Sequence, residues 1–388
     1  MRQPAVRLLA GLLWSLAAFG CAHRSEPPPP PAAPSLDEAQ VARLIPAKVQ
    51  DREGWASDVI VAIRLVKKEP TAERVCAVLA VLEQESGYQA DPPVSNLPGI
   101  VRRGLDEKLK PLGLLAGSAR EALLSGKAPG TTLTFEQRIG KLRTERDLDR
   151  LFRDLADHYE SRFPATFAVA NALGALLKGR RLEDLNPVTT AGSMQVKVSY
   201  AQEVGDREGL SDREVRELLY TRGGGVRFGT ARLIGYDASY DDILYRFADY
   251  NAGVYASRNA AFQAQLAEVT GTRLALDGDL LAYAEDGKPK DVETNSLRAL
   301  LAFGKQHGLS ASAVRRDAEQ EKTRAFEETD LWKLVREAWT DKMGKVPPYA
   351  RVPEVALSSP KLSRPRTTAW YADNVTRRYQ ACRARETQ

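Results

Sequence analysis

The segment Ala72–Glu85 constrains the fold more than any other part of this chain, because it is apolar on almost every side of a helix. Its apolar positions at helical spacing are Val75, Val78, Leu79 and Leu82, and Ala77 and Val81 widen the apolar surface. A helix of this kind is buried among other elements. Thr71 is a suitable N-cap, and Gly87 with Asp91–Pro93 ends the helix. The sequence therefore predicts a buried helix inside a helical domain.

The rest of the chain also favours helices. Helical patterns are predicted over 148–176, with an interruption near Pro164, and over 199–203, 213–220, 226–235, 241–250, 296–307, 329–343 and 369–385. Segments rich in Pro and Gly near 93–99, 128–131, 221–225 and 344–360 are predicted loops. The sequence has no strand-rich region and no internal repeat. The predicted fold class is mainly α.

The N-terminus has the features of an export signal. Arg2 and Arg7 frame the start of an uncharged apolar stretch, 8–19. That stretch is too short to span a bilayer with ease, since a spanning helix needs about 20 apolar residues. The tetrapeptide Ala-Phe-Gly-Cys at 18–21 resembles the lipobox of bacterial lipoproteins, with Ala18 in place of the usual Leu. The resemblance implies that residues 1–20 are removed and that Cys21 is lipidated. The alternatives are an ordinary secreted protein that is cleaved nearby and an uncleaved anchor.

A Pro-rich tether, residues 21–35, follows the cysteine. Its run Pro27–Pro31, with Pro34, favours extended polyproline II and a semi-rigid spacer. Ala22, a residue other than Asp after the cysteine, implies by the same resemblance an outer-membrane lipoprotein that faces the periplasm of a Gram-negative-type envelope. Residues 36–388 are the predicted folded domain. The expected partners are a membrane, through the lipid on Cys21, and no nucleic acid.

The charge balance and the histidines exclude other classes of protein. The chain has 56 basic and 51 acidic residues, a net charge of +5. This charge suits an anionic polymer such as the cell wall, but a weakly basic solvated surface has the same balance. Clusters of Lys or Arg interleaved with aromatics, typical of nucleic-acid binding, are missing from the sequence. His23, His158 and His307 have no metal-ligand spacing, so neither a metal site nor a cofactor is predicted.

Two cysteines remain if Cys21 carries a lipid. Cys76 and Cys382 are then an even pair in an oxidising compartment, where they form either a disulfide or two buried free thiols. Spacing alone leaves both alternatives open.

The C-terminal end of the buried helix carries two candidate acids, Glu83 and Glu85. A glutamate here lies in a low dielectric beside the negative end of the helix dipole. Both effects raise its pKa, which a general acid near neutral pH requires. Helical periodicity does not choose between the two glutamates.

Two further segments occur later in the chain. Gly192-Ser193-Met194-Gln195-Val196 and Asp249-Tyr250-Asn251-Ala252-Gly253 follow Glu85-Ser86-Gly87-Tyr88 in that order. Together the three segments resemble the soluble lytic transglycosylase family, which has a goose-type-lysozyme-like α fold. The resemblance implies that Glu85 is the catalytic glutamate, rather than Glu83. The residues that it implies for substrate binding are Ser86, Gly192, Met194, Gln195, Tyr250, Asn251 and Gly253. Gly229 and the last helix, with Tyr371 and Tyr379, also resemble parts of that fold.

The chain departs from the family pattern in two ways. Ser193 replaces the usual Leu, and Asp249 replaces the usual Ala. The spacing between the motifs also predicts two helical insertions, about 95–185 and 265–360, so the resemblance covers only the remaining pieces.

The resemblance implies cleavage of peptidoglycan glycan strands by one acid. Glu85 gives its proton to the oxygen between N-acetylmuramic acid and N-acetylglucosamine, and the 6-hydroxyl of the muramic sugar then attacks. The product is a 1,6-anhydro-muramyl end. Two alternatives stay open: a lysozyme-type hydrolase, for which Asp249 is a candidate second carboxylate, and a non-catalytic peptidoglycan-binding lipoprotein. Most glycosidases use two carboxylates. Asp249 is otherwise expected to be a solvated residue at a helix end.

Overall fold

The computed structural model describes residues 33–162, 186–240, 242–284, 288–357 and 366–386. Ser35–Gln388 forms one compact unit, distinct from Met1–Pro34. The predicted signal peptide, the lipidation residue Cys21 and nearly all of the tether lie outside the described residues. Among the described helices, none is long and apolar enough to cross a membrane.

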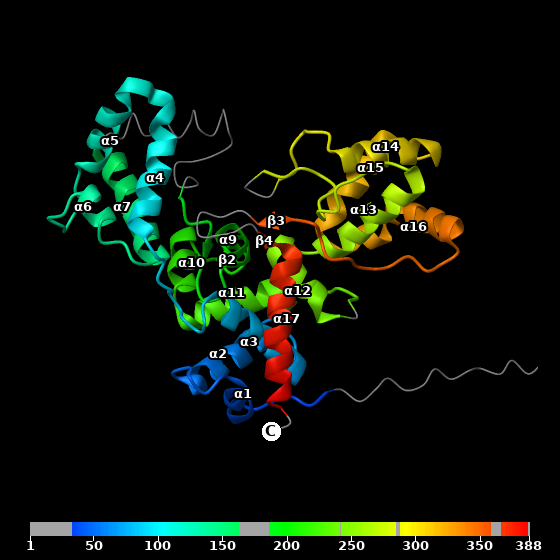
Figure 1. The fold of residues 1–388 in the computed structure, drawn as a ribbon, viewed down its shortest axis with the longest axis horizontal. Helices are drawn as coiled ribbons and strands as arrows, with labels where there is room; N and C mark the ends of the chain where they lie inside the picture. Colours follow the sequence, from blue (N-terminus) through cyan, green and yellow to red (C-terminus); the bar gives the residue numbers. More distant parts are fainter. Residues whose placement is uncertain (1–32, 163–185, 241, 285–287, 358–365, 387–388) are drawn as a thin grey trace, which may run out of the picture. The chain divides into compact units, whose positions relative to one another are not determined.

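Helices dominate the described chain, which confirms the mainly α class (Figure 1). The first half contains α1 (Glu38–Leu44), α2 (Arg52–Leu65), α3 (Ala72–Glu85), α4 (Leu97–Leu109), η1 (Lys110–Leu115), α5 (Ala116–Leu124), α6 (Phe135–Ile139), α7 (Glu145–Arg162), β1 (Thr190–Ala191) and β2 (Val196–Lys197). The two strands pair antiparallel, with Ala191 opposite Val196.

The second half contains α9 (Val198–Asp206), α10 (Asp212–Leu219), α11 (Arg222–Ile234), α12 (Ile243–Ala252), α13 (Ala256–Thr270), α14 (Asn295–Gln306), α15 (Ala311–Ala318), η3 (Glu319–Lys322), η4 (Arg324–Glu328), α16 (Asp330–Met343), β3 (Ala356–Leu357), β4 (Arg366–Thr367) and α17 (Thr368–Ala384). Strands β3 and β4 form a second short antiparallel pair.

Helix α3 lies in the larger of two hydrophobic clusters, as its apolar sequence predicts. Its residues from Val75 to Leu82 are all buried. Helix α17 packs on α3 and α12, and α2 packs along α11. The N-cap is Thr71, whose side chain accepts a hydrogen bond from the backbone N–H of Arg74. The predicted bounds and cap of this helix are therefore confirmed.

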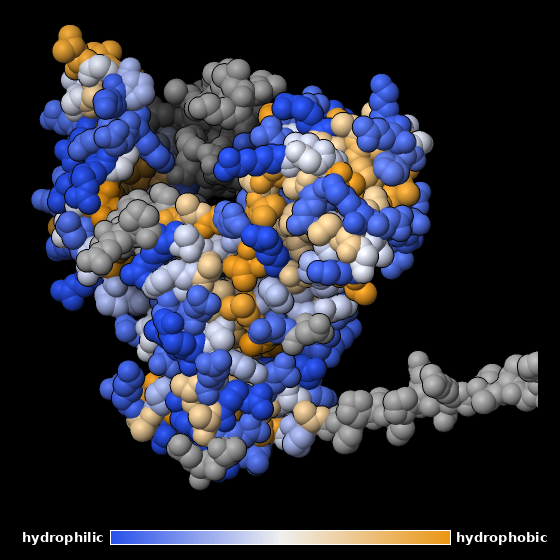
Figure 2. All heavy atoms as spheres, turned by 45° about the vertical axis from the view of Figure 1, so that its right-hand side comes forward, coloured by the Kyte–Doolittle hydropathy of each residue, from blue (hydrophilic) through white to orange (hydrophobic). Residues whose placement is uncertain are grey.

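A second hydrophobic cluster is formed by α13 to α16, with Phe262, Phe303 and Phe326 among its buried residues. It covers most of the second predicted insertion, and Figure 1 shows its helices grouped together. The described part of the first predicted insertion has no separate core, because Leu124 and Phe135 belong to the larger cluster. Where α4 meets α5, Leu114 and Leu115 are exposed, and Figure 2 shows apolar atoms at this tip.

One predicted loop is wrong, and a second, 93–99, is wrong in its last three residues, which begin α4. Residues 221–225 were expected to be a loop, but Gly223–Gly225 belong to the first turn of α11. The reason is close packing: a Cβ on Gly224 would lie 2.0 Å from the carbonyl oxygen of Leu218, and one on Gly225 would lie 2.6 Å from the hydroxyl of Ser193. Glycine is needed here for space within a helix rather than for a turn.

Candidate active site around Glu85

Glu85 is the last residue of α3 and is partly exposed at the end of an otherwise buried helix. The helix stops there because Gly87 adopts a positive φ of 59°. The Ser86 hydroxyl donates to the carbonyl of Leu82 at 3.2 Å and accepts from the N–H of Gln89 at 3.1 Å. Ser86 therefore caps the helix end and fixes the backbone that follows Glu85.

The two candidate glutamates have different neighbours. The charge of Glu83 acts on Tyr88, whose pKa is raised mainly by burial and secondly by that charge. The charge of Glu85 acts on two other buried phenols, Tyr250 and Tyr371, whose pKa values are also raised first by burial and next by Glu85. Glu85 is thus the glutamate that lies among residues of the third motif and of the last helix.

The second motif forms the turn between β1 and β2. Gly192 has a φ of 79°, and a Cβ on it would lie 2.2 Å from the carbonyl oxygen of Leu219. Met194 is fully buried, and its side chain fills the space left by Gly229, where a Cβ would lie 2.2 Å from the Met194 Sδ. The turn is therefore locked against α10 and α11 by two glycines.

Gln195 has a partner that the sequence does not suggest. Its Nε2 donates to the carboxylate of Glu145 at 2.9 Å, and its Oε1 accepts from the Thr190 hydroxyl at 3.1 Å. Glu145 starts α7 and is buried. A second carboxylate is thus held at the second motif, on the first predicted insertion. Only the tertiary contact identifies it, since no local sequence pattern pairs residues so far apart.

The third motif joins the second motif to the last helix. The buried Tyr250 hydroxyl donates to the Met194 carbonyl at 2.7 Å. The Asn251 side chain accepts from the Thr368 hydroxyl, at the start of α17, at 3.0 Å. Gly253 ends α12 with a φ of 139°. These contacts connect three segments that are far apart in the sequence.

Asp249 is buried and fully hydrogen-bonded, not solvated as expected. Its carboxylate accepts from the hydroxyls of Tyr236 and Tyr240, at 3.0 and 2.6 Å. It also accepts from the backbone N–H groups of Tyr255 and Ser257, at 3.1 and 2.6 Å. Burial raises its pKa, and the hydrogen bonds oppose that shift. Asp249 anchors the turn between α12 and α13.

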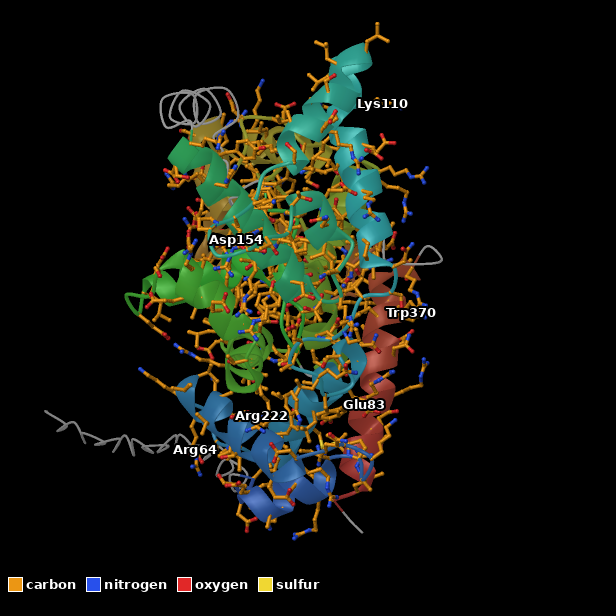
Figure 3. All side chains as sticks on the ribbon, turned by 90° about the vertical axis from the view of Figure 1, so that its left-hand side faces the viewer. Arg64, Glu83, Lys110, Asp154, Arg222 and Trp370 are labelled. Atoms are coloured by element: carbon orange, nitrogen blue, oxygen red, sulfur yellow. A yellow bond between two sulfur atoms is a disulfide. The ribbon has the colours of Figure 1, made fainter. Side chains whose placement is uncertain are left out.

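Helix α17 closes this region. Cys382 forms a disulfide with Cys76 of α3, so the first of the two alternatives for these cysteines is the one observed. Figure 3 shows Glu83 on α3 and Trp370 toward the N-terminal end of α17. Thr367 and Ala369 line a surface depression with the segment 351–356. This depression lies beside Thr368, the partner of Asn251.

The predicted site residues therefore fall into two groups. Glu85, Met194, Tyr250 and Asn251 belong to one connected set, together with Tyr371, which the sequence singled out only as part of a helix. Gly192, Ser86 and Gly253 shape the backbone of that set, and the Gln195 side chain is engaged with Glu145. In the described residues no group of three His, Cys, Asp or Glu side chains is arranged to hold a metal ion.

Comparison with known proteins gives a family for the chain. It is 38% identical over 375 residues to "Uncharacterized protein YaiW" of Escherichia coli (strain K12), and the match covers 96% of both chains. No solved structure matches. Residues 48–385 match the family described as Protein of unknown function (DUF1615), and the chain belongs to that family.

Proposed function

We propose that this protein is a peptidoglycan lytic transglycosylase with Glu85 as its acid and base. The observation that carries the proposal is the surroundings of Glu85: its charge acts on Tyr250 of the third motif and on Tyr371 of the last helix. The Tyr250 hydroxyl in turn donates a hydrogen bond to the backbone carbonyl of Met194 in the second motif. These contacts connect the three motifs that carry the family resemblance, which supports a single site around Glu85.

The proposed fold is a lysozyme-like domain carrying two helical insertions. Support comes from a buried helix that ends in the acid, a short hairpin that bears the second motif, and a final helix packed on α3 and α12. The second insertion has its own hydrophobic core, which is what an added subdomain requires.

The proposed chemistry uses one carboxyl group twice. Protonated Glu85 gives its proton to the glycosidic oxygen, and the bond from that oxygen to C1 of the muramic sugar breaks. The 6-hydroxyl oxygen of the same sugar forms a new bond to C1, and its proton returns to Glu85. Atoms and charge balance without water. Asp249 gives no support to a two-carboxylate hydrolase, because its oxygens accept four hydrogen bonds inside the fold.

We also propose that the protein is a lipoprotein of the outer membrane, facing the periplasm and anchored through Cys21. The disulfide between Cys76 and Cys382 supports export, because such bonds persist in oxidising compartments. Labelling cells with a radioactive fatty acid tests the anchor. Label on the wild type and none on Cys21→Ser is expected; equal label on both contradicts the anchor.

The test of the activity compares two neighbouring glutamates. Wild type, Glu85→Gln and Glu83→Gln are incubated with purified peptidoglycan, and soluble glycan fragments are measured. Glu85→Gln is expected to lose at least about 100-fold in rate, the scale of general acid catalysis. Glu83→Gln, two residues away on the same helix end, is expected to retain activity. Equal activity of wild type and Glu85→Gln would overturn the assignment.

A further inference from the structure

A lysine of the second hydrophobic cluster lies against the third motif. A Cβ on Gly253 would lie 3.8 Å from the Nζ of Lys322. Lys322 forms an ion pair with Asp279, and its Nζ lies 5.2 Å from the ring centroid of Tyr283. The second insertion thus contributes a positive charge at the edge of the candidate active site.

An arginine of α11 approaches the same site. The guanidinium of Arg232 lies 5.2 Å from the ring centroid of Tyr200. Its positive charge lowers the pKa of Tyr250, against the larger effects of burial and then of Glu85, which raise it. Arg232 and Glu85 are therefore both close enough to influence one phenol.

A third cation, Lys197, follows the second motif on β2. Its side chain is exposed to solvent, but the protein atoms around it remove part of the water from its ammonium group. This partial desolvation is the main cause that lowers the pKa of Lys197. The charges of Arg232 and Lys322 lower that pKa further, while the charge of Asp279 opposes them. Within the described chain, no carboxylate comes within ion-pair distance of Lys197 or Arg232, and Asp279 is the partner of Lys322. Lys197 and Arg232 are therefore left without an ion-pair partner among the described residues, beside the paired Lys322.

Such an arrangement is unfavourable until an anion binds. Like charges held together in a partly desolvated site repel one another, and a bound anion relieves that repulsion. Lys197 and Arg232 lie on β2 and α11, which pack in the larger hydrophobic cluster, whereas Lys322 lies on η3 beside the second cluster. The stability of a single helix or strand therefore does not explain why the three cations come together. They point instead to an anionic group on the ligand.

We propose that Lys197, Arg232 and Lys322 form a subsite for a carboxylate of the peptide stem carried by the glycan strand. This inference rests on the proposed function. The N-acetylated sugars of the strand are neutral, whereas the peptide on the muramic sugar carries free carboxylates. That peptide is attached to the sugar whose C1 bond Glu85 cleaves. A cationic subsite beside the acid therefore selects strands that still bear peptides.

The test measures binding, so that it does not depend on cleavage. The full-length protein in detergent, carrying Glu85→Gln, is co-sedimented with peptidoglycan whose peptide stems are intact and with the same material after its stem carboxylates have been converted to neutral amides with ammonia and a carbodiimide. Binding to the intact material is expected to be about tenfold tighter, the value of one or two charge-assisted contacts. The difference is expected to shrink at high salt.

Variants then assign the difference to the three cations. Lys197→Met combined with Lys322→Met is expected to abolish the preference for intact stems, and Arg232→Met to reduce it. The single variant Lys197→Arg conserves the positive charge and should keep most of the preference for intact stems. Lys305→Met, which removes an exposed charge on α14, is the matched control and should change nothing. Circular dichroism checks that each variant is folded.

The outcomes separate the two proposals. Equal binding to both materials, or a preference that the double substitution leaves intact, overturns the subsite. If the Glu85→Gln protein prefers intact stems but the wild type cleaves no glycan, the subsite stands and the catalytic assignment of Glu85 is overturned. No binding to either material overturns both.

Discussion

Cys76 of α3 is joined by a disulfide to Cys382 of α17, with 5.5 Å between their Cα atoms. The bond ties together the two helices that carry Glu85 and Tyr371. It also closes a loop of nearly the whole folded unit, because the sequence separation is 306 residues. The bond therefore restrains how α3 and α17 lie against each other, although Glu85 and Tyr371 are several helical turns away from it.

Removing this bond is expected to destabilise the fold. Cys76→Ala with Cys382→Ala should lower the free energy of unfolding by about 2–5 kcal/mol, because the unfolded chain regains conformational freedom. Denaturant unfolding measures the change, and wild type in excess dithiothreitol should behave like the double variant. Identical unfolding midpoints for oxidised and reduced wild type would contradict the expectation.

Two glycines with similar backbone angles give a matched pair. Gly192 and Gly209 have φ values of 79° and 77°, but only a Cβ on Gly192 meets a neighbour, the Leu219 carbonyl. Gly209→Ala should cost about 1 kcal/mol, the penalty of the left-handed conformation alone. Gly192→Ala should cost clearly more and also reduce glycan cleavage, because the second motif must move. Thermal unfolding of both variants measures the difference; equal costs would show that the turn is not locked.

Two buried tyrosines give a second pair. Tyr250 donates its hydroxyl proton to Met194, whereas the buried Tyr220 hydroxyl has no hydrogen-bond partner in the described part of the chain. Tyr250→Phe leaves a buried carbonyl unsatisfied and should cost about 1–3 kcal/mol. Tyr220→Phe should be neutral or stabilising. Urea unfolding of the two variants tests this, and a larger loss for Tyr220→Phe would refute the argument.

Acid should weaken the contact between α7 and α10. Glu217 of α10 accepts from Arg150, Arg153 and Arg146 of α7, and the hydrogen bond with Arg150 is the largest cause that lowers its pKa from 4.5 to about 2. A carboxyl group with a depressed pKa in the folded state stabilises above its unfolded pKa. That stability is lost as the pH falls from 4.5 toward 2.

The matching variant is Glu217→Gln. It should have a lower melting temperature than wild type at pH 7, and the two temperatures should converge as the pH approaches 2. The difference should also shrink with salt, since the carboxylate is about one-third exposed. A constant difference across this pH range would show that the charge of Glu217 is not the cause.

Local sequence patterns predicted α3 well and the surroundings of Glu85 incompletely. The bounds and cap of α3 follow from apolar periodicity and Thr71, which act within one segment. The start of α11 could not be predicted, because its glycines are required by contacts with Leu218 and Ser193 rather than by turn formation. The pairing of Gln195 with Glu145 likewise depends on how an insertion packs.

The chemistry of the cut ends tests the central claim most directly. Glycan fragments released from purified peptidoglycan by the wild-type protein, beside Glu85→Gln, are identified by mass spectrometry. The account predicts fragments that end in 1,6-anhydro-muramic acid, about 18 mass units lighter than hydrolysed ends because no water is added, from the wild type alone. Reducing ends from the wild type would contradict the one-acid mechanism, and no fragments from the folded wild type would contradict the catalytic role of Glu85.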